Sequence, residues 1–211
     1  MKITKFDSNS FYHIYNRSIG SELLFVFEND YKYFIEKMNR FLFSFSEIIA
    51  YCLLPNHFHL LIKIKDKEDL SARVQCKGYQ SGVQKELNID QALKNFFNSY
   101  TRSYNIAHTR YGRLFQHGYK YKEINSDEYL LWLIYYIHRN PVHHKLTIKC
   151  QDWNYSSYNE IINEKNKTNS EFVFDLFGDK HEFIDLTSEL TLEYNKENLS
   201  RKYSKDNIEY E

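Results

Sequence analysis

The sequence is poor in residues that break or cross-link a fold. It contains only 2 proline, 6 glycine and 3 cysteine residues among 211, with no internal repeat and no Pro/Gly/Ser-rich linker. The cysteines, Cys52, Cys76 and Cys150, are odd in number and have no paired spacing. This argues against a disulfide framework or a thiolate metal site and indicates a reducing compartment. We therefore expect one full-sized domain with an extension.

Long apolar runs are also absent. Residues 1–10 lack the apolar core of a secretion signal, and no run of hydrophobic residues approaches the length of a membrane span. No glycine-rich P-loop pattern occurs, so the sequence offers no ATP-binding motif of that kind. We expect a cytoplasmic protein with no membrane partner.

The formal net charge is zero, but the charge is unevenly distributed. Residues 1–150 hold 21 basic and 14 acidic side chains, whereas residues 151–211 hold 7 and 14. Residues 91–122 contain no acidic side chain and interleave basic residues with aromatic rings, as a nucleic-acid groove would, although an ordinary solvated helix face could have this bias too. The candidate DNA-binding residues are Arg17, Arg102, Arg110, Arg113, Lys120 and Lys122.

Hydrophobic periodicity predicts the order β-α-β-β-α-β followed by one more helix. Strands are expected over 11–17, 47–54, 57–65 and 118–124, and helices over 31–43, 88–108 and 127–140. The last helix is expected to end at Asn140 because Pro141 follows, and residues 180–211 are expected to form a peripheral tail. The order predicts an α+β, ferredoxin-like fold: an antiparallel sheet covered on one face by two helices, with an additional helix.

Two histidines begin the third predicted strand. Side chains alternate along a strand, so His57 and His59 project from one face, about 7 Å apart, while Phe58 projects from the other. A lone histidine would usually be an ordinary structural residue, but two at this spacing can converge on a single cation. The pair suggests a metal site.

The last predicted helix carries Tyr136 and Asn140 four residues apart, and this spacing puts both on one helical face. A phenol can act as a nucleophile, and an amide oxygen is a hard metal ligand. Tyr135 lies about 100° round the helix and is expected to pack in the core. His138 could be a ligand but does not share the stripe. By itself, such a tyrosine stripe is far more often core than catalytic.

Five motifs follow one another along the chain. They are FYHIYNR at 11–17, AYCLLPNHFHLLI at 50–62, GRLFQHGYK at 112–120, YIHRNPV at 136–142 and DWNYSSY at 152–158. Together they resemble the single-tyrosine His-hydrophobic-His transposases, and within that group the REP-associated tyrosine transposases and their relatives. The resemblance covers roughly residues 11–160 of the sequence. Residues 66–90 are outside the shared pattern, and their role is open.

The resemblance implies specific roles. His57, His59 and Asn140 would be ligands of Mg²⁺ or Mn²⁺, and Tyr136 would be the nucleophile. We expect a transposase catalytic domain over 1–150 and an acidic C-terminal extension over 151–211. The implied activity is metal-dependent cleavage and rejoining of single-stranded or hairpin DNA through a 5′-phosphotyrosine. A homodimer in which Tyr136 completes a partner's site is an open alternative.

Two other functions compete with this one. A metal-dependent phosphodiesterase would activate water instead of Tyr136, and a covalent protein–DNA adduct would distinguish the two. A domesticated binding module would hold hairpin DNA or RNA without cutting it. That module would not need all four candidate positions to be filled, as they are here.

Overall fold

The computed structural model describes residues 6–66 and 88–188. Contacts group the chain into two units: residues 1–49 with 53–123, and residues 50–52 with 124–211. This grouping does not test the domain boundary at residue 150, which stays a prediction. No helix in the described ranges combines the length and the apolar character that a membrane crossing requires.

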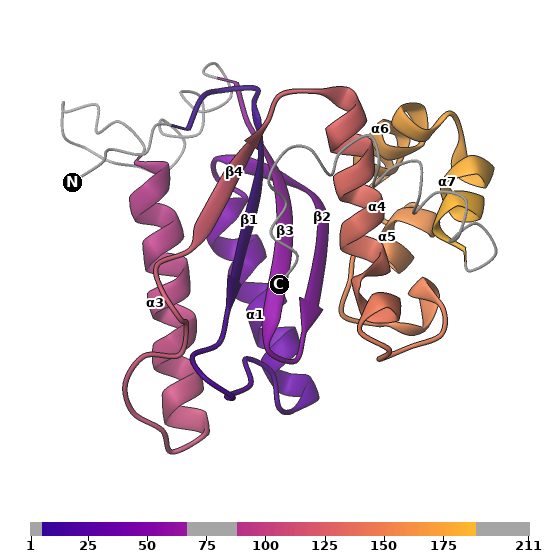
Figure 1. The fold of residues 1–211 in the computed structure, drawn as a ribbon. Helices are drawn as coiled ribbons and strands as arrows, with labels where there is room; N and C mark the ends of the chain where they lie inside the picture. Colours follow the sequence, from indigo (N-terminus) through magenta and orange to yellow (C-terminus); the bar gives the residue numbers. More distant parts are fainter. Residues whose placement is uncertain (1–5, 67–87, 189–211) are drawn as a thin grey trace, which may run out of the picture. The chain divides into compact units, whose positions relative to one another are not determined.

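A four-stranded antiparallel sheet lies mainly in the first unit. Its strands are β1 (Phe11–Arg17), β2 (Ser46–Leu54), β3 (His57–Ile64) and β4 (Lys120–Ile124). They lie in the order β2-β3-β1-β4, so that β3 is inserted between β1 and β2 (Figure 1). With the helices between them, this is the split βαβ arrangement, and the predicted α+β, ferredoxin-like class is confirmed.

Two helices, α1 (Glu28–Leu42) and α3 (Ile89–Ala107), cover one face of the sheet. The ring of Phe58 on β3 lies 5.2 Å from that of Phe34 on α1 and 5.5 Å from that of Phe97 on α3, measured between centroids. Phe58 is fully buried, as strand alternation predicted. Burying a side chain of this size contributes about 1.5–3 kcal/mol, so these contacts hold the helices on this face.

The second unit consists mainly of helices. They are α4 (Asp127–His143), a 3₁₀ turn (Cys150–Asp152), α5 (Tyr158–Ile162), α6 (Lys167–Phe177) and α7 (Lys180–Thr187). The expectation of a peripheral tail from residue 180 is wrong for its first part. Phe183 of α7 is fully buried and packs against Phe177 and Tyr158, so α7 belongs to the core of this unit.

The expected end of α4 at Asn140 is also wrong, because the helix continues through Pro141 to His143. Proline removes one backbone donor, but here only two helical residues follow it. Backbone hydrogen bonds continue directly after the proline. His144 N–H donates to the Asn140 carbonyl at 2.9 Å, and Leu146 N–H donates to the Pro141 carbonyl at 2.8 Å. Pro141 is itself buried.

Candidate active site

Strand β3 presents His57 and His59 on the sheet face opposite α1 and α3, because Phe58 between them points toward the helices. The two rings are nearly perpendicular, with centroids 5.3 Å apart. His59 is buried and His57 is half-buried. The Nδ1 atom of His57 lies 2.7 Å from Oδ1 of Asn56. An amide oxygen only accepts, so Nδ1 carries the proton and Nε2 of His57 carries the lone pair.

Strand β1 brings a third histidine to this face. In the β1–β3 register His13 pairs with Leu61, and two residues further along β1 Tyr15 pairs with His59. Nε2 of His13 lies 3.0 Å from Nδ1 of His59, and the two rings are nearly parallel. Burial, aided by the positive charge of Lys122, lowers the pKa of His13 to about 3, so this imidazole is neutral at physiological pH.

His13 lies within the FYHIYNR motif, but the sequence pattern assigns it no role. Alternation along β1 puts its side chain on the same face as that of Tyr15. The missing information was the pairing of β1 with β3, which makes this face of β1 adjacent to His59.

Basic residues from β1 and β4 lie on the same face as the histidines. Arg17 is the register partner of His57. The Nζ atom of Lys120 lies 5.7 Å from the centroid of the Tyr15 ring, and Lys122 is close enough to His13 to affect its pKa. Half of the predicted DNA contacts thus share a sheet face with two predicted metal ligands. Positive charge here would suit a phosphate backbone.

In the second unit, α4 carries Tyr136 and Asn140 one turn apart. Tyr136 is half-buried, and its ring stacks on Trp132 with centroids 5.0 Å apart and planes 10° apart. Asn140 is only 1% exposed, and its Nδ2 donates to the backbone carbonyl of Tyr136 at 2.8 Å. Its Oδ1 is buried and has no hydrogen-bond partner among the residues that the structure describes.

The neighbouring candidates on α4 have other surroundings. His138 is fully buried, lies 2.8 Å from Ser157 Oγ through its Nε2, and packs edge-on against Phe183. Tyr135 is half-buried, and burial raises the pKa of its phenol. His138 therefore has a packing role. Tyr135 and Tyr136 are both half-buried, so burial does not distinguish the two tyrosines, and the choice of Tyr136 stays a prediction.

These side chains fit a divalent cation in their chemistry. Within residues 6–66 and 88–188, no three His, Cys, Asp or Glu side chains form a group that could hold a metal. The imidazoles of His57 and His59 are nitrogen ligands, and a divalent cation of this kind also takes oxygen ligands. Asn140 offers a buried carbonyl oxygen of that kind, and nitrogen–oxygen ligation is compatible with Mg²⁺ or Mn²⁺.

The remaining predicted DNA contacts lie at the C-terminal end of α3 and in the loop that follows. Arg110 forms an ion pair with Glu22 and donates to Asn105 Oδ1 at 2.7 Å and to the Arg113 carbonyl at 2.6 Å. These contacts give Arg110 a role within the fold, and DNA contact by this side chain stays a prediction. Arg102 lines a surface pocket of about 580 Å³ beside this loop.

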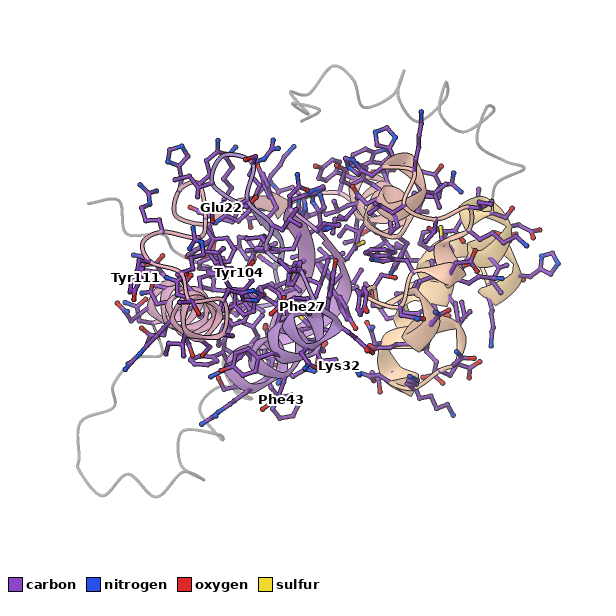
Figure 2. The ribbon with its side chains drawn as sticks, turned by 90° about the horizontal axis from the view of Figure 1, so that it is seen from below. Glu22, Phe27, Lys32, Phe43, Tyr104 and Tyr111 are labelled. Carbon is purple, nitrogen blue, oxygen red and sulfur yellow. The ribbon has the colours of Figure 1, made fainter. Side chains whose placement is uncertain are left out.

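The aromatic residues of this stretch are divided between core and surface. Tyr100 and Tyr104 are buried, and their hydroxyl groups donate to the carbonyls of Leu24 and Leu23. Tyr111, in contrast, is 89% exposed. Figure 2 labels Glu22, Tyr104 and Tyr111 around the end of α3. Much of the aromatic content therefore builds the core, and Tyr111 is available to a ligand.

Comparisons with known proteins agree with this picture. No family model matches the chain. A curated protein of Haemophilus influenzae, whose name assigns it provisionally to the REP-associated tyrosine transposases, is 30% identical over 117 residues. That match covers 55% of this chain and 61% of the relative, which is less than two thirds of its length.

A solved structure, described as a REP-associated tyrosine transposase bound to a REP hairpin, has a TM-score of 0.56 at 14% identity. It covers 78% of this chain and 86% of that chain, and at this identity it supports the fold alone.

The sheet order and the paired histidines of β3 define an α+β protein with a ferredoxin-like sheet and a His-hydrophobic-His strand. Within that class, the sequence is similar over 117 residues to a protein named for the REP-associated tyrosine transposases.

Proposed function

We propose that this protein cuts and rejoins single-stranded DNA through a covalent bond to Tyr136, as a metal-dependent transposase. The observation that carries the proposal is the pairing of Tyr136 with Asn140 on α4. The phenol of Tyr136 is only half-buried, while the amide oxygen of Asn140 is buried and lacks a hydrogen-bond partner among the described residues. A buried carbonyl in that condition is unfavourable unless another ligand engages it.

The metal ligands would be His57, His59 and Asn140. A bound Mg²⁺ or Mn²⁺ would withdraw charge from the phosphoryl oxygens and stabilise the leaving 3′-oxygen. The protein's own contribution is to hold its ligands in place. Asn56 fixes the proton of His57 on Nδ1, and the backbone carbonyl of Tyr136 fixes the amide group of Asn140.

The covalent step belongs to Tyr136. Its Oη attacks phosphorus, a bond forms between that oxygen and the 5′-phosphate, and the bond from phosphorus to the 3′-oxygen breaks. The phenolic proton leaves, and the released 3′-oxygen takes up a proton. The stack of Tyr136 on Trp132 restricts the ring before attack. A second 3′-hydroxyl can reverse the step, so joining needs no nucleotide cofactor.

We propose hairpin-bearing single-stranded DNA as the substrate. The solved relative is described as bound to a REP hairpin. In this chain, Arg17, Lys120 and Lys122 supply positive charge beside the histidines, as a phosphate backbone requires. Tyr111 offers an exposed ring for stacking on an unpaired base.

An adduct assay with matched variants tests the proposal. The full chain is incubated with Mn²⁺ and a labelled single-stranded oligonucleotide that carries a hairpin, and products are separated under denaturing conditions. The wild-type protein is expected to form a DNA-shifted band, and Tyr136→Phe is expected to form none. That substitution keeps the ring on Trp132 and removes only the attacking oxygen. Tyr135→Phe is the matched control and should form the adduct.

Each result separates the competing functions. Cleavage without an adduct, unchanged in Tyr136→Phe, would indicate a phosphodiesterase that activates water. Hairpin binding with neither cleavage nor adduct would indicate a binding module. An adduct that persists in Tyr136→Phe and disappears in Tyr135→Phe would mean that the neighbouring tyrosine is the nucleophile.

A further inference from the structure

A buried hydrogen bond between two histidines joins β1 to β3. Nε2 of His13 and Nδ1 of His59 are 3.0 Å apart, and the ring planes differ by 21°. His13 is only 7% exposed, and its ring also stacks on that of Tyr15. His13 is therefore held in one orientation against the second histidine of the HFH sequence.

A hydrogen bond between two neutral imidazoles contains one proton, so one ring donates and the other accepts. If His59 donates from Nδ1, its Nε2 carries the lone pair. If His13 donates instead, the proton of His59 lies on Nε2, and that nitrogen cannot bind a cation.

The neighbouring ligand candidate follows the first of these two patterns. His57 donates from Nδ1 to Asn56 Oδ1, and its Nε2 therefore carries the lone pair. A cation can bind both imidazoles in the same way only if His59 also has its proton on Nδ1. An acceptor for that tautomer is Nε2 of His13, which lies 3.0 Å from Nδ1 of His59 on the adjoining strand.

We propose that His13 is a positioning residue that accepts the Nδ1 proton of His59 and thereby turns the Nε2 lone pair of His59 toward a divalent cation. The inference rests on the metal site of the proposed function and adds its supporting residue. Partners of this kind fix the tautomer and the ring orientation of a metal-bound histidine, and their loss weakens metal affinity by about 10–100-fold.

Two substitutions at position 13 separate positioning from packing. His13→Phe keeps a ring in the stack with Tyr15 but has no acceptor. His13→Gln has a smaller packing surface but can offer an amide oxygen near the position of Nε2. If His13 only fills space, phenylalanine is the better replacement. If His13 accepts a hydrogen bond from His59, glutamine is the better replacement.

The experiment measures Mn²⁺ affinity of the full chain without DNA, from the electron paramagnetic resonance signal of free Mn²⁺. His13→Phe is expected to bind about 10–100-fold more weakly than the wild-type protein, and His13→Gln is expected to recover most of that loss. His57→Ala serves as the reference for loss of a ligand. Circular dichroism confirms that each variant is folded.

Failure of the inference is distinguishable from failure of the proposed metal site. Wild-type affinity in His13→Phe, together with lost binding in His57→Ala, would overturn the role of His13 alone. Wild-type affinity in both would remove the metal site as well. If His13→Phe does not fold, the ¹⁵N spectrum of the metal-free wild-type imidazoles decides. A proton on His59 Nδ1 supports the inference, and a proton on His59 Nε2 overturns it.

Discussion

Replacing Asn140 with leucine should make the metal-free protein no less stable and abolish its response to metal. The two side chains have similar shapes, so the substitution mainly removes polar atoms. Asn140 is 1% exposed, and its Oδ1 has no hydrogen-bond partner among the described residues. Relief of one such buried group contributes about 1–3 kcal/mol, and loss of the Nδ2 bond to the Tyr136 carbonyl removes about 0.5–1.5 kcal/mol.

The expected net change in the free energy of unfolding is about −0.5 to 2.5 kcal/mol, where a positive value favours the variant. For a chain of this size, 1 kcal/mol corresponds to a shift in Tm of about 2–4 °C. In the presence of metal, the wild-type protein should become more stable than Asn140→Leu. A ligand at one hundred times its Kd stabilises the native state by about 2.7 kcal/mol, and only the wild-type protein should gain this.

Urea unfolding in EDTA and in Mn²⁺ measures both quantities. Ser170→Ala is the matched control, because Ser170 Oγ on α6 is also buried without a partner among the described residues. It should stabilise the protein equally with and without metal. If Asn140→Leu were less stable than wild type by more than about 1 kcal/mol in EDTA, the Asn140 amide would have to be satisfied in the metal-free protein, contrary to this prediction. An unchanged Mn²⁺ effect in that variant would exclude Asn140 as a ligand.

Three further results are expected. Trp132→Phe should slow adduct formation up to about 10-fold at unchanged Mn²⁺ affinity, as measured by single-turnover kinetics. The substitution weakens the aromatic pair that restrains Tyr136, which contributes about 0.5–1.5 kcal/mol. Replacing Lys120 and Lys122 by alanine should make the salt dependence of single-stranded DNA affinity shallower by about 0.7 in slope per lost phosphate contact, and an unchanged slope would remove both from the interface. Arg110→Ala should lower the free energy of unfolding by about 0.5–1 kcal/mol, because it removes an ion pair with the exposed Glu22 and hydrogen bonds near the surface. Wild-type stability together with a shallower salt slope would instead make Arg110 a DNA contact.

The sequence predicts the elements well where the signal is local. Alternation predicted residues 11–17 as a strand, and β1 has those bounds. A helix was predicted over residues 88–108, and α3 spans Ile89–Ala107 with Asn88 as its cap, whose side chain accepts from Gln91 N–H. The end of α4 was predicted wrongly. Proline disfavours a helical conformation in the residue before it, but the backbone hydrogen bonds of the turn after Pro141 stabilise two further helical residues.

The candidate site is less predictable, because it depends on contacts between distant residues. His57 and His59 share a face by strand geometry alone. His13 is 46 positions before His59 and meets it only through the β1–β3 register. Arg110 was predicted to contact DNA from the composition of its segment, which cannot reveal its ion pair with Glu22. The metal ligands, the nucleophile, the DNA contacts and the cytoplasmic location stay predictions.

The stack of Tyr136 on Trp132 gives the protein an intrinsic optical probe. The chain has only two tryptophans, and Trp153→Phe would leave Trp132 as the sole indole emitter. Its ring centroid lies 5.0 Å from that of the proposed nucleophile. Formation of the phosphotyrosine would place a negative charge beside the indole and remove tyrosine emission at that position. Stopped-flow fluorescence could then time strand cleavage and rejoining within a single turnover, without a label on protein or DNA.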